Sequence, residues 1–364
     1  MIISQIIETL EDFAPLVLQE NFDNSGVQVG DISQKVKGIL LCLDVTEEVL
    51  EEALKLNCNL IISHHPLLFK PIKKLTGKTY IERCIINACK NDLVIYAAHT
   101  NVDNAFGGLN FYLATKLGLQ NLQTLSPKKD GLLKLVTFVP EAQAETLRGA
   151  LFSAGAGGIG NYDSCSFNVS GAGTFRAGEQ TRPFAGNRLE LHTEPEIRIE
   201  TILPIHKKSA VLRALFACHP YEEPAYDFYA LANEWTAVGS GVVGELPSPE
   251  QEDSFLQRLK TVFELQSIKH SPLTGRGIRK VALCGGNGAF LIPDAIACGA
   301  DVFITGEAKY NDYYDVENKI LLTVVGHYES EIITKELFYD VITKKITNFA
   351  LHFSTTNLNP VNYL

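Results

Sequence analysis

The sequence predicts an α/β fold, in which a core of parallel-rich mixed sheets flanked by helices is interrupted by an inserted α+β domain. Two observations lead to this prediction. Short apolar runs alternate with amphipathic segments in the first and last thirds of the chain, a pattern typical of parallel strands covered by helices on both faces. The middle third is instead rich in glycine and in acidic-aromatic loops, and it contains an internal repeat.

The first third predicts strands followed by helices. An apolar run over 36–45 is followed by Thr46, a good N-cap for a helix over 47–56. The pattern recurs with a strand over 57–66, a helix over 80–92 and a strand over 93–103. The last third resumes it with strands over 279–286, 300–306 and 319–327, and helices over 291–299 and 330–342.

The middle segment carries two similar halves. Pro140 matches Pro204, and Ala150-Leu151-Phe152 matches Ala214-Leu215-Phe216 at the same offset. Each copy predicts a strand, a turn at proline, an amphipathic helix and a return strand, and two such units form a ferredoxin-like module. We therefore expect an inserted ferredoxin-like domain over 130–234, with 1–129 and 235–364 forming one α/β core.

The composition restricts the class of protein. The formal charge of −10 does not favour binding to nucleic-acid phosphate or to an anionic membrane. The N-terminal segment lacks the basic start of a secretory signal, and no apolar run has the length of a membrane span. The eight cysteines form no C-x-x-C pair. We therefore expect them to be small buried apolar residues in a reducing compartment, which predicts a cytoplasmic location and no zinc-thiolate site.

Histidine and carboxylate residues follow three of the predicted strands. They are His64 with His65, His99 with Asp103, and His327 with Glu331. Ligands of open parallel sheets collect at the carboxyl ends of the strands, so these side chains are expected to face one cleft. Neutral imidazole and carboxylate suit Zn, Mn, Fe or Co.

The alternative is that each residue has an ordinary structural role. A histidine at a strand end is usually a satisfied polar residue, Asp103 suits an Asx-turn, and Glu331 suits the first turn of a helix. If the metal interpretation holds, the turn after the first predicted strand end lets His64 and His65 reach different ions. Glu331 could then bridge two ions about 3.5–4 Å apart, as in two-metal hydrolytic sites.

Three further segments are candidates for the pocket or for interfaces. The glycine-rich turn over 284–290 could hold an anion with its backbone amides, or be only a tight turn. The 303–312 segment offers Thr305, Glu307 and Lys309 to a polar substrate, or is an ordinary loop. The 218–229 segment is expected to be a domain interface, with a metal site at His219, Glu222 and Glu223 as the less favoured alternative.

These segments together resemble the NIF-three-like family, also labelled GTP cyclohydrolase I type 2 homologues. The matching motifs are NFDNSGVQVGD, LLCLDVTEEVLEEA, IISHHPLLF, AAHTNVDNAFGGLN, GADVFITGEAKY and GHYESE. They run in family order over most of 1–120 and 240–364. CHPYEEPAYD resembles the inserted PII-like or CutA-like domain of the long members.

The resemblance implies a dinuclear metal centre in a toroidal homohexamer. It implies two divalent ions per chain, zinc above Mn, Fe or Co, and it points to the ligands His64, His65, Asp103, His327 and Glu331. His99 is implied as a base or substrate contact. Asn311 departs from the family, which has histidine there, and any reaction that uses that imidazole is therefore in doubt.

Two functions from different classes follow. The first is a metal-dependent hydrolase acting on a small phosphorylated or nucleotide-like substrate, with His99 or Glu307 moving protons. Ring opening of a purine nucleotide, a GTP cyclohydrolase-type reaction, is one specific version. The second is a non-catalytic metal-binding hexameric scaffold that senses or chaperones metal.

Overall fold

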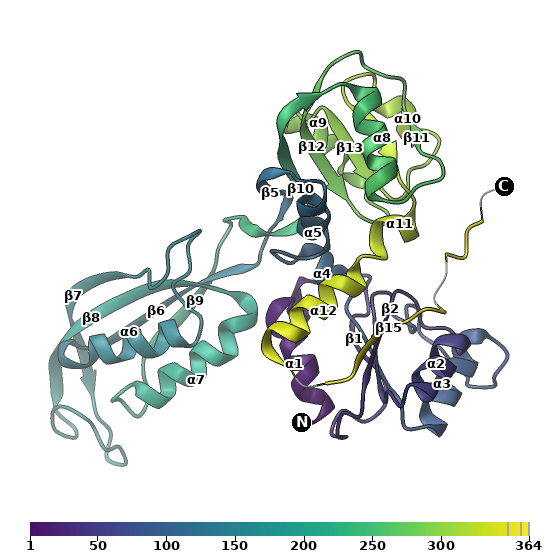
Figure 1. The fold of residues 1–364 in the computed structure, drawn as a ribbon. Coiled ribbons are helices and arrows are strands. Elements are labelled where there is room, and N and C mark those ends of the chain that lie inside the picture. Colours follow the sequence, from purple (N-terminus) through teal and green to yellow (C-terminus); the bar gives the residue numbers. More distant parts are fainter. Residues whose placement is uncertain (348, 357–358, 363–364) are drawn as a thin grey trace. The chain divides into compact units, whose positions relative to one another are not determined.

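The computed structural model describes residues 1–347, 349–356 and 359–362. They divide into two compact units, Met1–Pro127 with Ala237–Leu364, and Lys128–Thr236. Each unit contains helices packed on β-sheet (Figure 1). The predicted α/β class, with mixed sheets flanked by helices, is confirmed.

The first unit contains a five-stranded sheet in the order β1-β4-β3-β2-β15. Its strands are β1 (Gly26–Val29), β2 (Ile39–Cys42), β3 (Leu60–Ser63), β4 (Val94–Ala97) and β15 (Leu351–Phe353). β2, β3, β4 and β15 run parallel, and β1 is antiparallel to β4. Every residue of β2, β3 and β4 is buried, because helices cover both faces of the sheet.

The helices on this sheet are amphipathic and lie in two layers. One layer holds α1 (Ile3–Phe13) and α12 (Thr334–Lys345), and the other holds α2 (Glu47–Lys55) and α3 (Tyr80–Lys90) (Figure 1). As expected, α2 begins after Thr46, whose side chain accepts a hydrogen bond from the Val49 amide. A short 3-10 turn, η1 (Leu16–Leu18), follows α1.

A six-stranded sheet in the same unit has the order β11-β14-β13-β12-β10-β5. Its strands are β5 (Gln120–Lys128), β10 (Trp235–Glu250), β11 (Lys269–His270), β12 (Ile278–Cys284), β13 (Val302–Thr305) and β14 (Leu321–Val324). β12, β13 and β14 run parallel, while β10 and β11 are antiparallel to their neighbours β12 and β14. The longer helices of this part are α5 (Leu109–Lys116), α8 (Glu252–Val262) and α9 (Ile292–Ala297).

Short helices follow several strand ends of the first unit. They are α4 (Thr100–Asn104), η4 (Ala289–Leu291), α10 (Asp312–Asp315) and α11 (His327–Glu331). The prediction of a single helix over 330–342 is wrong, because the structure has two helices there. The chain forms α11 and then α12, separated by Ile332 and Ile333, with the Thr334 hydroxyl donating to the Glu331 carbonyl. Glu331 therefore ends one helix, where the sequence pattern placed it at the start of another.

The second unit has the element order βαββαβ. It contains β6 (Leu132–Pro140), η2 (Glu141–Gln143), α6 (Ala144–Ser153), β7 (Phe167–Arg176), β8 (Leu191–Pro204), η3 (Ile205–Lys207), α7 (Lys208–Cys218) and β9 (Tyr226–Ala230). The strand order is β7-β8-β6-β9, and all three pairings are antiparallel. This arrangement supports a ferredoxin-like domain. We retain that assignment, and the division of the chain into a core and an insert, as proposals.

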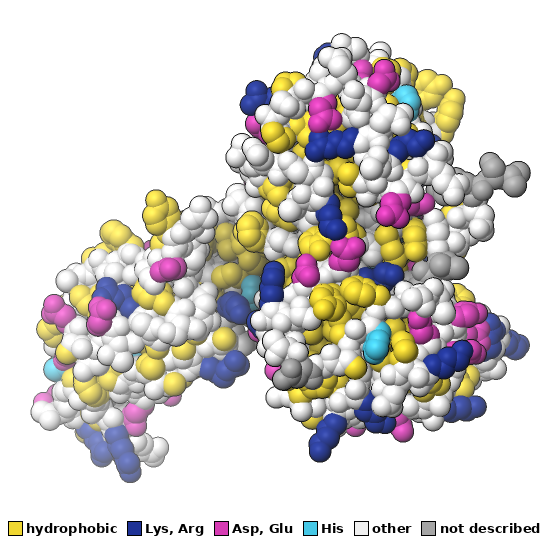
Figure 2. All heavy atoms as spheres, in the orientation of Figure 1, with side chains coloured by type: hydrophobic (Ala, Val, Ile, Leu, Met, Phe, Trp, Pro, Cys, Tyr) yellow, Lys and Arg dark blue, Asp and Glu magenta, His cyan; other side chains and the backbone are white. Residues whose placement is uncertain are grey.

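The described surface is mixed in charge. Figure 2 shows lysine and arginine side chains scattered among acidic and apolar ones over the face in view. Cys89 and Cys218 are exposed, so the expectation that the cysteines are uniformly buried is wrong for these two. Within the described ranges, no helix is both long and apolar enough to cross a membrane.

Glu52 of α2 holds the segment after β15. Its buried carboxylate accepts hydrogen bonds from the side chains of Ser354, Thr355 and Thr356 and from the Thr355 amide, at 2.6 to 2.9 Å. Burial alone would raise the pKa of Glu52, but these donors outweigh it and lower the pKa from 4.5 to about 2. The stabilisation is thus present above pH 4.5 and is lost as the pH falls through about 2.

We expect Glu52→Ala to lower the free energy of unfolding by about 2–3 kcal/mol at pH 7, because several donors lose a charged acceptor. Thermal unfolding followed by circular dichroism measures the loss. Glu51→Ala is the matched control, since Glu51 lies on the same helix and is exposed. Equal unfolding temperatures for the two variants would contradict this role of Glu52.

Candidate metal centre

Three parallel-strand ends of the first unit bring histidines together. His64 and His65 follow β3, His99 follows β4, and His327 follows β14 at the start of α11. The ring centroids of His64 and His65 are 5.1 Å apart, those of His64 and His99 are 5.2 Å apart, and those of His65 and His327 are 5.3 Å apart. The histidines of the three strand ends therefore lie close together, as expected, and their cluster joins residues of both sheets.

The β3 end explains how adjacent histidines reach one cleft. The strand stops at Ser63, and the His65 amide still donates to the Leu43 carbonyl at 2.9 Å. His64 is fully buried, whereas about a fifth of the His65 side chain is exposed. In a regular strand, two adjacent rings would point to opposite faces of the sheet. Because the strand ends before His64, the backbone can turn, and both rings reach the same cluster, with His64 buried and His65 partly exposed.

His64 and His65, which follow β3, are each fixed by a hydrogen bond at Nδ1. His64 Nδ1 lies 2.9 Å from the Ala98 carbonyl oxygen, and His65 Nδ1 lies 2.7 Å from Asp44 Oδ1. Both partners are acceptors, so each Nδ1 carries the hydrogen in the bond. This leaves Nε2 of each neutral ring as the atom available to a metal, the arrangement in which metal-binding histidines are normally fixed.

The other two histidines have carboxylate partners. His99 Nδ1 lies 2.7 Å from Asp23 Oδ1, and His327 Nδ1 lies 2.9 Å from Glu307 Oε1. Thr100 also donates to Asp23, through both its amide and its hydroxyl. Burial opposes ionisation of Asp23, but the hydrogen bond to His99 and that histidine's charge hold the pKa of Asp23 well below its usual range.

Glu331 lies between the histidines and is almost fully buried. Its Oε2 atom is 2.8 Å from His65 Nε2 and 2.9 Å from His327 Nε2. Its Oε1 atom is 3.8 Å from His64 Nε2, which in turn is 3.7 Å from Asp103 Oδ1. The two oxygens of one carboxylate thus face two different groups of donors.

Two atoms of this cluster lack a partner within the protein. His64 Nε2 and Asp103 Oδ1 are buried and have no hydrogen-bond partner among the described residues. Buried polar atoms are normally paired, and an unpaired one calls for an explanation such as a bound ion. Donor atoms of His64, His65 and His99 lie within 4.8 Å of one another, as do those of His65, His327 and Glu331. The residues present therefore fit divalent metal.

The pKa values of the clustered side chains are shifted by burial and by their neighbours. Burial would raise the pKa of Glu331, but hydrogen bonds to the surrounding imidazoles hold it well below 4.5. Burial and the charge of Glu331 raise the pKa of Asp103 well above its usual value. Burial opposes protonation of His65, yet hydrogen bonds to Asp44 and Glu331 raise its pKa to about 10. The pKa of His64 is lowered, chiefly by burial.

Of the two alternatives for the glycine-rich turn after β12, an anion site or only a tight turn, the hydrogen bonds favour the tight turn. Three of its amides already donate to side chains: Gly285 to Asn110, Gly286 to Ser330 and Gly288 to Thr305, at 2.9 to 3.0 Å. Thr305 is fully buried in these contacts, which favours a structural role for it over the alternative of a contact with substrate.

The turn instead makes room for Glu331. Gly286 has a φ of +58°, and a Cβ atom there would lie 2.1 Å from Glu331 Oε1. Glycine is required both for this left-handed conformation and for the close approach of the carboxylate.

Sequence reasoning gave no role to two aspartates that hold the histidines. Asp44 lies just after β2, a strand end like the others, so the same criterion would have found it. Asp23 lies in the loop before β1, where no periodicity marks it. Glu307, proposed as a catalytic residue, is about half exposed and contacts His327. Asn311 is exposed just before α10.

The family model described as Duf34/NIF3 (NGG1p interacting factor 3) matches residues 1–360. The chain belongs to this family. A relative from Halalkalibacterium halodurans, named GTP cyclohydrolase 1 type 2 homolog, is 37% identical over 364 residues, covering 99% of this chain and 98% of the relative. The resemblance seen in the sequence motifs is thus confirmed.

Solved structures of the family show the same fold. A Bacillus cereus protein related to NIF3 matches with a TM-score of 0.87 and 36% identity, covering 100% of this chain and 99% of that one. A Staphylococcus aureus protein matches with a TM-score of 0.78 and 28% identity, again covering 100% and 99%. Both matches extend over the whole length of the chain.

Proposed function

We propose that the chain is a dinuclear-metal-dependent hydrolase acting on a small phosphorylated or nucleotide-like substrate. The observation that carries this proposal is the pair of unpartnered buried atoms, His64 Nε2 and Asp103 Oδ1, within a cluster of histidines anchored through Nδ1. Buried polar atoms are normally paired, so two unpaired atoms 3.7 Å apart in one cluster point to a bound ion.

The proposed ligands fall into two groups that share one carboxylate. His65, His327 and Glu331 Oε2 form the first group, and His64, Asp103 and Glu331 Oε1 form the second. Glu331 is the proposed bridge because its two oxygens face different groups. Imidazole and carboxylate donors suit Zn, and also Mn, Fe or Co. Such ions supply Lewis acidity, which activates water and polarises the bond under attack.

Residues around the ligands are proposed to orient groups and move protons. Asp23 fixes the His99 ring from Nδ1, which leaves Nε2 to accept or donate a proton beside the other histidines. Glu307 holds His327 in the same way, and its exposed side can exchange protons with solvent. The relatives' name suggests a GTP cyclohydrolase-type ring opening as one version of the reaction.

The test separates catalysis from metal binding. The wild type and His99→Gln are loaded with zinc or manganese, analysed for metal, and assayed against a panel of nucleotides and phosphoesters. We expect equal metal content and a roughly 10²–10⁴-fold lower kcat in the variant, the usual contribution of a general acid or base. A metal-loaded wild type without turnover on any substrate would favour the non-catalytic metal-binding scaffold. The homohexamer and the cytoplasmic location remain predictions.

A further inference from the structure

The second unit contains a cavity of about 1000 Å³ on one face of its sheet. The opposite face packs on α6 and α7 through Leu135, Val139 and Ile199, among other apolar side chains. Phe138 and Arg198 alternate with these residues along β6 and β8 and lie directly opposite each other in the register. Because strand side chains alternate between faces, the cavity lies on the face away from the helices.

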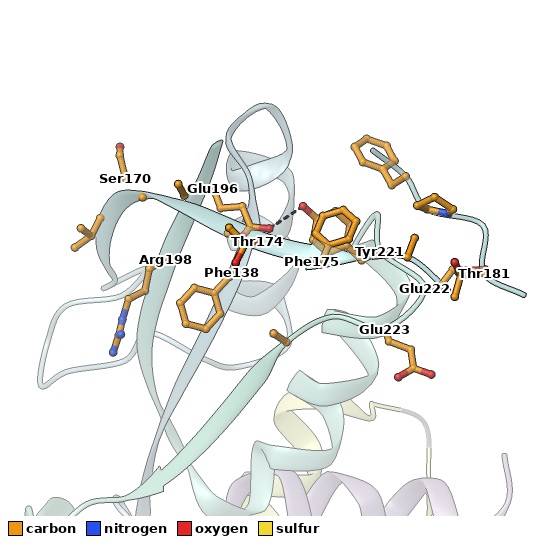
Figure 3. Close-up of a pocket in the computed structure, with 18 of the residues that line it drawn as sticks. Phe138, Ser170, Thr174, Phe175, Thr181, Glu196, Arg198, Tyr221, Glu222 and Glu223 are labelled. Atoms are coloured by element: carbon orange, nitrogen blue, oxygen red, sulfur yellow. Dashed lines mark hydrogen bonds between the residues drawn. The ribbon is translucent and has the colours of Figure 1, made fainter. Parts of the chain in front are cut away.

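Small residues of β7 create the space (Figure 3). Gly171 pairs with Glu196 across the β7–β8 ladder. A Cβ atom on the nearby Gly173 would lie 2.1 Å from Glu196 Oε2. Glycine at this position therefore lets the Glu196 carboxylate lie over the sheet, and the segments 180–184 and 221–225 contribute to the wall of the cavity.

Aromatic rings form much of the lining. Tyr221 lies 5.9 Å from Phe175 and 6.2 Å from Phe184, measured between ring centroids. Phe138 adds a further ring on β6, and it is labelled among the lining residues in Figure 3. A cavity of this size with aromatic walls suits an organic ligand of the size that protein pockets usually bind.

The charge of the lining is negative. Glu196, Glu222 and Glu223 line the cavity together with a single cation, Arg198. Arg198 is already paired with Glu200, at 2.9 Å. The positive charge among the lining residues is therefore compensated by a residue outside the lining.

Glu196 is the residue that points to a ligand. Only 9% of it is exposed, and its Oε1 atom accepts a hydrogen bond of 2.7 Å from the Tyr221 hydroxyl, a neutral donor. Within the described residues it makes no ion pair with lysine, arginine or histidine. A buried carboxylate without a cationic partner is costly. A ligand cation in the cavity would provide that partner.

A metal ion is not the expected occupant. Both nitrogens of His219 are used within the fold, since Nε2 bonds to the Phe138 carbonyl at 2.8 Å and Nδ1 accepts from the Tyr221 amide at 3.1 Å. The metal site considered above for His219, Glu222 and Glu223 is therefore not formed. The size of the cavity and its rings also favour a larger ligand over a bare ion.

We propose that this cavity binds an organic cation, in which an amine or quaternary ammonium group is carried on an aromatic or apolar body. The charged group lies against Glu196 and the ring of Tyr221, and the apolar body packs on Phe138, Phe175 and Phe184. Rings attract cations through their faces, and the attraction is larger where water is excluded. The site lies within 128–236 and is independent of the metal centre.

The test is isothermal titration calorimetry on the full chain. The probe is benzyltrimethylammonium, and benzoate is an anion of similar size. We expect the cation to bind and benzoate not to bind. Glu196→Gln keeps the shape and an acceptor for Tyr221, and should weaken cation binding roughly tenfold. Glu145→Gln on α6, at the surface of the helix layer, should leave it unchanged.

Phe184→Ala provides a second variant at an exposed ring, so the proposal can still be judged if Glu196→Gln does not fold. It should also weaken binding of the cation. Absence of cation binding up to about 10 mM, a weak affinity on any scale, would overturn the proposal. So would equal binding of benzoate, or unchanged affinity in a folded Glu196→Gln variant.

Discussion

Glu331→Ala is expected to remove both of the proposed metal ions from the chain. The two oxygens of this carboxylate face different sets of donors, with Oε2 near His65 and His327 and Oε1 near His64. Its loss takes an anionic ligand from each ion at once. We expect metal content to fall from about two ions per chain to near zero after gel filtration, through a loss of affinity well beyond the roughly 10–100-fold typical of outer-shell changes.

Elemental analysis of the purified variant measures this loss. Glu336→Gln is a suitable control, because Glu336 is an exposed carboxylate on α12 that pairs with Lys116. The control should keep its full metal content. If Glu331→Ala retained two ions per chain while folded, the proposed bridging role would be wrong, and the ligand set would have to be drawn from the remaining histidines.

Metal affinity is expected to rise steeply with pH, because metal and protons compete for the same atoms. His65 must lose a proton before Nε2 can bind a metal, and hydrogen bonds to Asp44 and Glu331 raise its pKa to about 10 in the metal-free protein. Asp103, with its raised pKa, can release a second proton. Each proton released adds about tenfold in affinity per pH unit below the pKa of its group. From pH 6 to 8, the His65 proton alone accounts for about 100-fold.

Calorimetric titration of zinc into the metal-free protein tests this linkage. At pH 7 we expect release of at least about one proton per chain, detected as a binding heat that depends on the ionisation enthalpy of the buffer. Asp44→Asn should reduce the release, since it removes a hydrogen bond that raises the pKa of His65. Asp23→Asn, the same change beside His99, should alter it less, because Asp23 contacts His99 and not His65. Buffer-independent heats for the wild type would contradict the protonation pattern.

The position of the site was predictable because it depends on sheet geometry. Each apolar run that ended in histidine became a buried parallel strand, and parallel strands of one sheet end at one edge. The Asp103 and Glu331 carboxylates follow such ends by a few residues, so local sequence was sufficient to select them. Local patterns could not predict that the two sheets meet at His65 and Glu331, because these residues are 266 positions apart in the sequence.

The surrounding residues were harder to predict. Asp23, Asn110 and Ser330 are isolated polar residues that form hydrogen bonds from a loop and two helices, and a single polar residue on such elements has no periodic signal. The role of the glycine-rich turn could not be chosen from the sequence, because the same glycine spacing serves an anion nest and a tight turn with a close approach of side chains. Only the position of Glu331 relative to Gly286 distinguishes the two.

The cavity of the second unit was not anticipated at all. Its residues come from different strands and segments of 138–225, and its space depends on glycines to which the sequence pattern gave no particular role. The repeat did predict the strands and helices around it. Pro140 and Pro204 each end a strand and precede a 3-10 turn and a helix, as the matching positions indicated.

Anomalous diffraction from crystals of the wild type grown with zinc tests the central claim most directly. Data collected on both sides of the zinc absorption edge locate each ion without reference to the protein. The account predicts two peaks per chain about 3.5–4 Å apart, one beside His65 and His327 and the other beside His64 and Asp103, with Glu331 between them. A single peak, or peaks away from Glu331, would contradict it.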